Sequence, residues 1–215
     1  MAERKMHLLD EWTAKHIAIF MIAKGYTPQR RAFRRELKGN WVVVTVQHST
    51  RTPLHNDASR FTLNLGILCT RVAQYFEAQR PQPVPDFDSC HVKFRLGDFL
   101  NEPYDVWWEV GVSPAADSDV AKAIGQLLFS IALPQIELLA DDAALRDLWL
   151  AGRAPGLTDF ERLMNLSALV MQIGPHSCAL NVASELDSRF VGKAVEARAR
   201  EQAAKVRAQL ERIPK

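Results

Sequence analysis

Six side chains in the first half of the chain have types that suit molecular recognition. Amide groups offer hydrogen-bond donors and acceptors, a guanidinium binds carboxylate or phosphate, and an indole offers a flat aromatic surface. Tryptophan beside charged groups is also common in binding hot spots. The candidate binding residues are Gln47, Asn64, His91, Arg95, Trp107 and Glu109.

Histidines would support a different chemistry. His48, His55, Asp57 and His91 could ligate a metal if the loop 50–58 folded over the strands, and His91 with its polar neighbours could serve a hydrolase, including one that acts on nucleic acid. However, no two of these residues share a compact ligand spacing, and no carboxylate at a suitable spacing would hold the ring of His55. The chain also has no G-x-S-x-G, glycine-rich phosphate loop or H-E-x-x-H. We therefore expect a mobile surface loop, histidines that do not converge, no metal, no cofactor and no catalytic residue.

The composition is that of a globular protein. With 215 residues, 47% of them hydrophobic, the chain can bury one full core, with or without a helical appendage. A net charge of +2 gives no overall field that would attract nucleic acid or an anionic membrane. Basic residues do predominate at both ends, where they could pair with the acidic middle or form basic patches. We expect a protein partner and neither nucleic acid nor a membrane.

Three cysteines without a C-x-x-C pattern argue against a disulfide framework and against a structural zinc site. Free cysteines of this kind are usually small buried apolar residues. The N-terminal residues have an apolar stretch too short for a targeting segment, and no small-residue cleavage site follows it. These features favour a cytoplasmic protein.

Period-two alternation predicts a sheet in the first half of the chain. An amphipathic helix over about Glu3–Lys24 ends at Gly25, and two extended runs then flank a tight turn at Lys38-Gly39-Asn40. Further strands are predicted over 60–68, 90–96 and 106–112. The sheet therefore has about five strands, mostly antiparallel.

The second half of the chain has helical periodicity. Helices are predicted from Asp117 to a break at Pro134, from Asp141-Asp142 to Leu150, from Thr158 or Asp159 onward, and as one long helix over 185–212. The last helix has a narrow apolar seam of Ala203, Val206, Leu210 and Ile213. The fold class is α+β, with a domain over 1–150 and a C-terminal helical extension over 151–215 packed on it.

Alternation also divides the candidate residues between the faces of the sheet. If Val42, Val44 and Val46 face the core, all six candidates lie on the other face. Trp108 and Val112 should then be core residues, whereas His48 should face away from Gln47. Such a polar face has two interpretations. In the first it has only a structural role: it is either solvated, with cross-strand pairs such as Arg95–Glu109, or covered by the helices of the second half. In the second it is a binding surface.

Five motifs, in this order, resemble those of the family named domain of unknown function 4304. They are VVVTVQHS, FTLNLGI, CHVKFRLGDF, VWWEV and IALPQIE. The resemblance covers about residues 8–150, so that residues 151–215 would be an added helical extension. It implies a fold and no reaction, and is loosely associated with bacterial accessory or immunity-like proteins.

The sequence thus favours a non-catalytic protein-binding module, an adaptor or immunity-like protein, that uses the polar face of its sheet. The C-terminal helix could also form a homodimer. The hydrolase that uses His91 is the alternative.

Overall fold

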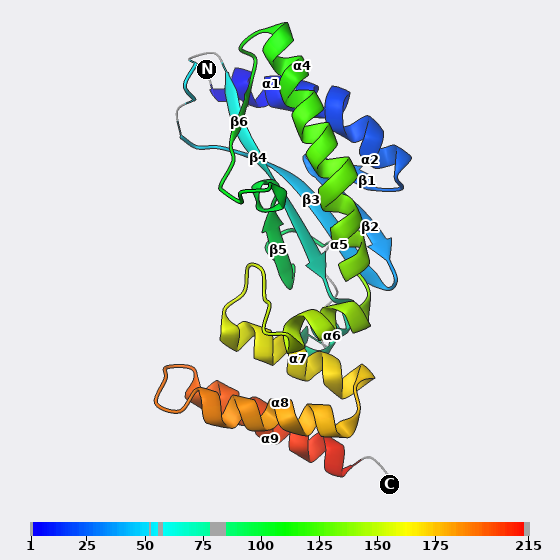
Figure 1. Cartoon of the computed structure of the whole chain (residues 1–215), viewed down its shortest axis with the longest axis vertical. Helices are drawn as coiled ribbons and strands as arrows, with labels where there is room; N and C mark the ends of the chain where they lie inside the picture. Colours follow the sequence, from blue (N-terminus) through cyan, green and yellow to red (C-terminus); the bar gives the residue numbers. More distant parts are fainter. Residues whose placement is uncertain (1, 52, 56–57, 78–84, 213–215) are drawn as a thin grey trace.

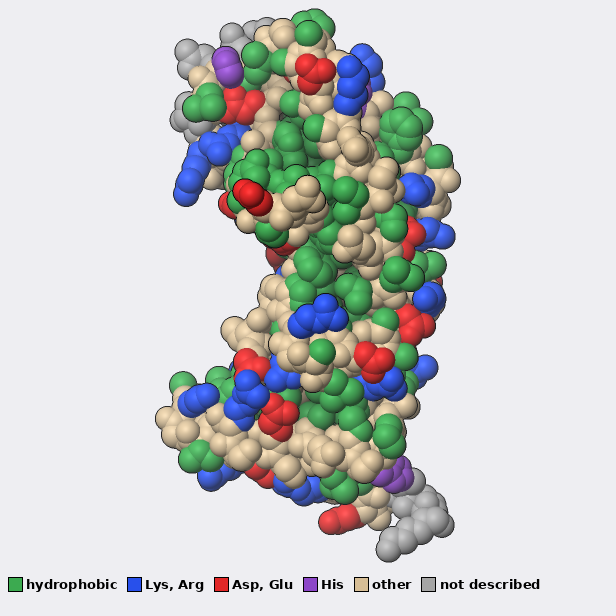
Figure 2. All heavy atoms as spheres, in the orientation of Figure 1, with side chains coloured by type: hydrophobic (Ala, Val, Ile, Leu, Met, Phe, Trp, Pro, Cys, Tyr) green, Lys and Arg blue, Asp and Glu red, His purple; other side chains and the backbone are tan. Residues whose placement is uncertain are grey.

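The computed structural model describes residues 2–51, 53–55, 58–77 and 85–212. Its fold is the predicted α+β arrangement: an N-terminal helix, an antiparallel sheet and a series of helices (Figure 1). The molecule is elongated, with the sheet in one half and the last helices stacked in the other. Figure 2 shows that the outline is hollowed on one side between these halves.

The sheet has the strand order β1-β2-β3-β4-β5, and the short β6 pairs with the other end of β4, on the same edge as β5. All pairs are antiparallel. The strands are β1 (Thr27–Gln29), β2 (Ala32–Leu37), β3 (Asn40–His48), β4 (Ser59–Leu68), β5 (Val92–Arg95) and β6 (Trp108–Val110). The first two had been predicted as one run, which a turn with Arg30 at φ 54° divides.

The last two strands are shorter than predicted. Leu96 begins a 3-10 turn, η2 (Leu96–Phe99), that ends β5. Val112 lies beyond β6 and is 40% exposed, so the prediction of a core position was wrong. Because β5 and β6 both pair with β4 and not with each other, Arg95 and Glu109 are not cross-strand partners.

The predicted turn between β2 and β3 is confirmed and also sets the junction with the helices. Lys38 and Gly39 both have positive φ, 53° and 84°, as a two-residue hairpin turn of this type requires. Asn40 follows as a buried residue. Its amide donates to Ala140 O and to the Asp142 carboxylate and accepts from Thr70 N, at 2.8–2.9 Å.

Two long helices cover the inner face of the sheet, which carries Val42, Val44 and Val46 (Figure 1). The first is continuous through α1 (Ala2–Thr13), the π-helical η1 (Ala14–Ala18) and α2 (Ile19–Ala23), and Gly25 at φ 84° ends it as predicted. The second runs through α4 (Pro114–Gly125), the π-helical η3 (Gln126–Ala132) and α5 (Leu133–Leu139).

Two details of the second helix differ from the prediction. It begins at Pro114, because the Ser113 hydroxyl caps Ala116 N at 3.2 Å, and Asp117 instead accepts from Gly111 N. Pro134 does not break it. The preceding π-helical turn bonds Leu133 N to Leu128 O, and such a wider turn accommodates a ring that lacks an N–H.

By length and composition this helix, Pro114–Leu139, is also the one described helix that could cross a membrane, and 33% of its apolar window is buried in the protein. Its inward side contributes Ile124, Leu128 and Ile136 to the core. Core helices share this pattern, so the observation is weak support for a membrane span.

The remaining helices are α3 (Thr70–Glu77), α6 (Asp142–Leu150), α7 (Asp159–Ile173), α8 (His176–Arg189) and α9 (Glu196–Glu211). Asp141 caps α6, and Thr158 caps α7 with Glu161 in a capping box. The core continues from the sheet into these helices without interruption.

The prediction of one long helix over 185–212 was wrong. The chain turns at Gly192, where φ is 72°, and α9 folds back along α8. Phe190 is buried at this turn against Phe160, with ring centroids 5.4 Å apart. Ala203 and Val206 of the predicted seam are buried within the chain, Leu210 packs partly against the core, and Ile213 lies outside the described residues.

Candidate binding site on the outer face of the sheet

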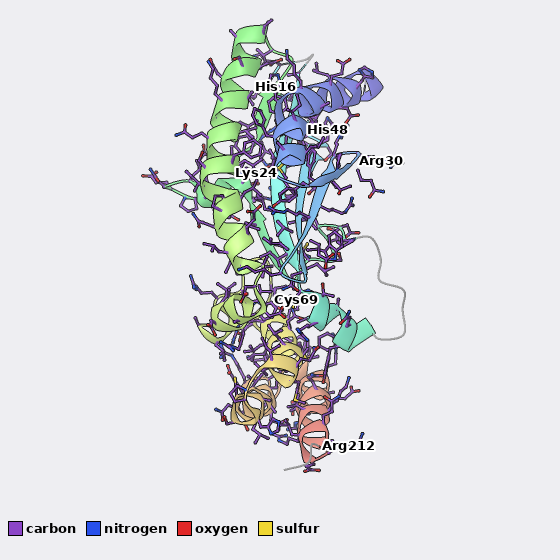
Figure 3. All side chains as sticks on the ribbon, turned by 90° about the vertical axis from the view of Figure 1, so that its right-hand side faces the viewer. His16, Lys24, Arg30, His48, Cys69 and Arg212 are labelled. Carbon is purple, nitrogen blue, oxygen red and sulfur yellow. The ribbon has the colours of Figure 1, made fainter. Side chains whose placement is uncertain are left out.

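The outer face of the sheet, opposite the two long helices, has an apolar end that is covered. This covered end consists of Trp41, Val43, Leu68 and Cys90, against which Ala73 of α3 packs. Gly66 lies among them, and a Cβ there would stand 2.6 Å from Cys90 Sγ. In Figure 3 the long helix α4–α5 stands on one side of the sheet and α3 lies on the other side, near Cys69.

The other end of the outer face is polar. We call it the open end because Gln47 and the neighbouring Arg51 and Asp105 are exposed, although Thr62 and Asn64 on β4 are buried. Asn64 Nδ2 donates to Gln47 Oε1 at 2.8 Å, as neighbouring outward positions on β3 and β4 allow. Beside them is a pocket of about 280 Å³. Its lining residues are Gln47, His48, Ser49, Thr50, Arg51, Arg95, Asp105 and Trp107.

Two arginines contact the Trp107 ring at this open end. The guanidinium carbon of Arg95 is 5.3 Å from the indole centroid, and that of Arg60 is 5.7 Å from it. Cation–π contacts of this kind hold both cations and the ring in place. Trp108, the next residue, packs against the core on the opposite face, 6.3 Å from the Phe61 ring, so the predicted division between the two tryptophans is confirmed.

Asp105 contacts both Arg95 and Trp107, which line the pocket with it. Its carboxylate pairs with Arg95 Nη1 and accepts a hydrogen bond of 3.1 Å from Trp107 Nε1. Burial alone would raise the pKa of Asp105, but these hydrogen bonds and the charges of Arg95 and Arg51 lower it. The group is therefore ionised at neutral pH.

Glu109 anchors the loop that follows β3. Its carboxylate accepts from Leu54 N at 2.7 Å and contacts His55 Nδ1 at 3.1 Å. Burial would raise the pKa of Glu109, but the hydrogen bonds from Leu54 and His55 lower it. Contrary to the prediction, a carboxylate therefore does hold His55, and residues 53–55 are attached to the strands. Residues 52, 56 and 57 lie outside the described part of the chain.

His91 lies at the covered end, away from the other candidates. Its Nδ1 accepts a hydrogen bond of 3.0 Å from Cys69 N, which leaves the proton of the neutral ring on Nε2. Burial, with the charge of Lys93, lowers the pKa of His91 to about 4. In Figure 3, His48 and Cys69 lie at opposite ends of the sheet, so His48 is far from His91. Residues 2–51, 53–55, 58–77 and 85–212 contain no group of three or more His, Cys, Asp or Glu that could hold a metal.

The structure thus brings five of the six candidates to the open end and adds three residues that the sequence analysis missed: Arg51, Arg60 and Asp105. Period-two alternation could have identified Arg60, because this residue of β4 is paired with Glu109 of β6 and shares its face. Arg51 and Asp105 are on irregular segments, for which periodicity gives no signal.

The comparison with protein families gives one match. The model of the family described as Domain of unknown function (DUF4304) matches residues 17–137, more than half of the chain. The matched segment lies inside the range that the sequence motifs indicated. It includes the sheet, the C-terminal part of the first long helix and nearly all of the second. The helices after residue 140 lie beyond it. No curated protein and no solved structure matches the chain.

Proposed function

The chain belongs to the DUF4304 family, whose name assigns no activity, and we propose that it is a non-catalytic protein-binding module, an adaptor or immunity-like protein, that uses the open end of its sheet. One observation carries the proposal: the Trp107 ring contacts the guanidinium groups of both Arg60 and Arg95 beside a pocket on the outer face. Tryptophan and arginine are among the residue types most enriched in interface hot spots.

The residues around Trp107 suit binding to a partner better than they suit packing within the chain. Gln47, Arg51 and Asp105 are exposed around it, although the ring itself is half-buried. Because the two guanidinium groups and the Gln47–Asn64 pair fix the surface in advance, a partner loses little binding free energy to ordering it.

No observation favours the hydrolase alternative. His91 is committed to a backbone hydrogen bond at the covered end, and its lowered pKa keeps it neutral. A cytoplasmic location agrees with the three free cysteines, of which Cys69 and Cys90 are buried.

Affinity capture tests this function. The immobilised protein is exposed to extract of its source cells, and the retained proteins are identified for wild type, Trp107→Ala and the control Leu138→Ala. Leu138 is 69% exposed on α5, on the other side of the sheet, so the control removes an exposed apolar side chain away from the site. We expect a partner that wild type and the control retain and Trp107→Ala loses. Retention by all three would refute the proposal.

A further inference from the structure

Two hydrogen-bond donors at the open end converge on a single carboxylate. Arg95 Nη1 and Trp107 Nε1 both contact Asp105, through different carboxylate oxygens. A guanidinium and an indole N–H can only donate, so the position between them must hold an acceptor, and an anionic one binds best. Arg95 Nη1 and Trp107 Nε1 therefore form a binding site for a carboxylate, which Asp105 occupies.

Asp105 occupies this place from an exposed connection. Residues 101–105 are all exposed between η2 and β6, and the Asp105 side chain itself is 58% exposed. By contrast, Trp107 and Arg95 are half-buried on β6 and β5 or beside them. The donors are thus held by the sheet, whereas the acceptor can leave by rotation about its own side-chain bonds.

The charge around the pocket exceeds what Asp105 neutralises. Arg51 lines the pocket with Arg95, and the guanidinium of Arg60 contacts the Trp107 ring. In the described part of the chain neither Arg51 nor Arg60 forms an ion pair, and Glu109 is engaged by Leu54 and His55. Asp105 is thus the one described carboxylate that forms an ion pair with any of these three arginines, and the guanidinium groups of Arg51 and Arg60 remain to attract further negative charge.

From these observations we propose that the pocket binds a carboxylate of an acidic segment of the partner protein. In the unbound protein the Asp105 side chain occupies the position of that carboxylate. This inference rests on the proposed function and names the chemistry of the partner. A pocket of about 280 Å³ is at the lower limit for a small-molecule site and matches one or two side chains of a protein. The donors already bind a carboxylate, which favours an Asp or Glu side chain over a phosphate.

A titration followed by the indole N–H signals in ¹H–¹⁵N spectra tests the inference. The Trp107 signal is assigned from its loss in Trp107→Phe. The probes are an end-capped tetraglutamate peptide, the matching tetraglutamine peptide and inorganic phosphate. We expect a saturable shift of the Trp107 signal with tetraglutamate alone, and none in Arg95→Met.

The variant Asp105→Asn gives the sharper result, since it weakens the internal competitor while it keeps the size of the side chain. We expect its affinity for tetraglutamate to rise by about tenfold, because a ligand no longer has to displace an ion pair. Glu102→Gln is the matched control: it removes the same charge from the same exposed connection, three residues away, and should raise the affinity much less.

Several outcomes would overturn the inference. They are an unchanged or lower affinity in Asp105→Asn, an equal gain in Glu102→Gln, or a saturable shift with phosphate and none with tetraglutamate. If Trp107→Ala loses the captured partner but tetraglutamate does not bind, this inference fails and the proposed function stands. If tetraglutamate binds as expected but capture does not depend on Trp107, the carboxylate site is supported and the proposed function fails.

Discussion

The covered and open ends of the outer face are built on the same two strands, but they differ in what surrounds them. Along β3 the outward residues are Trp41, Val43, Thr45 and Gln47, and along β4 they are Leu68, Gly66, Asn64 and Thr62 in the paired order. Both strands thus change from apolar to polar in the same direction. The apolar end, which includes Cys90, packs against Ala73 of α3, whereas the polar end carries the pocket and the exposed Arg51 and Asp105.

The two ends of one sheet face therefore differ in role: the covered end packs within the chain, and the open end is the proposed binding surface. His91 shows the point, since it has a residue type suited to chemistry but lies at the covered end. Its hydrogen bond to Cys69 N and its lowered pKa make it part of the packing there. The comparison makes quantitative predictions: changes at the covered end should reduce stability, and changes at the open end should reduce binding.

The largest effect is expected for Leu68→Ala at the covered end. Leu68 is 4% exposed, so truncation should lower the free energy of unfolding by about 3 kcal/mol through lost burial and a cavity. Urea denaturation measures this loss. The control Arg51→Ala, at the open end, should change stability by less than about 0.5 kcal/mol. Similar losses in both variants would remove the distinction between the two ends.

The second prediction concerns pH and His91. The folded pKa of His91, about 4, is below its value of 6.5 in the unfolded chain, so the unfolded state binds more protons between these values. The contribution of neutral His91 to stability is complete above pH 6.5. As the pH falls towards 4 this contribution is lost, and the free energy of unfolding falls by roughly 2–3 kcal/mol.

The matched control is His91→Asn, which keeps a side-chain acceptor for Cys69 N but does not titrate. We expect its free energy of unfolding to fall less steeply than that of wild type between pH 7 and pH 4. Parallel pH profiles for the two proteins would show that folding does not lower the pKa of His91.

A smaller effect is expected for Glu109→Gln, which weakens the anchor of residues 53–55. Loss of the charged acceptor for Leu54 N and His55 should cost about 1 kcal/mol. Hydrogen exchange of the Leu54 amide should become faster, whereas exchange in β3 should not change. An unaltered Leu54 rate would mean that the loop is held by other contacts.

The smallest effect on stability is expected for Trp107→Ala, below about 1 kcal/mol, because the half-buried ring contacts guanidinium groups and does not pack against the hydrophobic core. Trp108→Ala is the natural pair. Trp108 is half-buried and packs against the core, so its loss should cost about 2 kcal/mol, less than for a fully buried tryptophan. Thermal denaturation of both variants tests the order, and a larger loss for Trp107→Ala would make that residue structural.

Much of the architecture followed from local signals. Period-two alternation placed Gln47, Asn64 and Trp107 on one face, since neighbouring strand residues must point to opposite sides. Gly25, Gly39 and the cap residue Asp141 marked turns and helix ends, because these features depend on a few adjacent residues. The family motifs agreed with this order of elements.

Other features depended on contacts between distant segments. The break near Gly192 requires Phe190 to pack on Phe160, and the continuous helix at Pro134 depends on a π-helical turn that helical periodicity does not reveal. At the site, the sequence alone determined which strand residues share the outer face. The tertiary structure decided that Asp105 meets Arg95 and Trp107 and that His91 is half-buried at the covered end, because irregular segments and neighbouring helices determine which half of a face stays accessible.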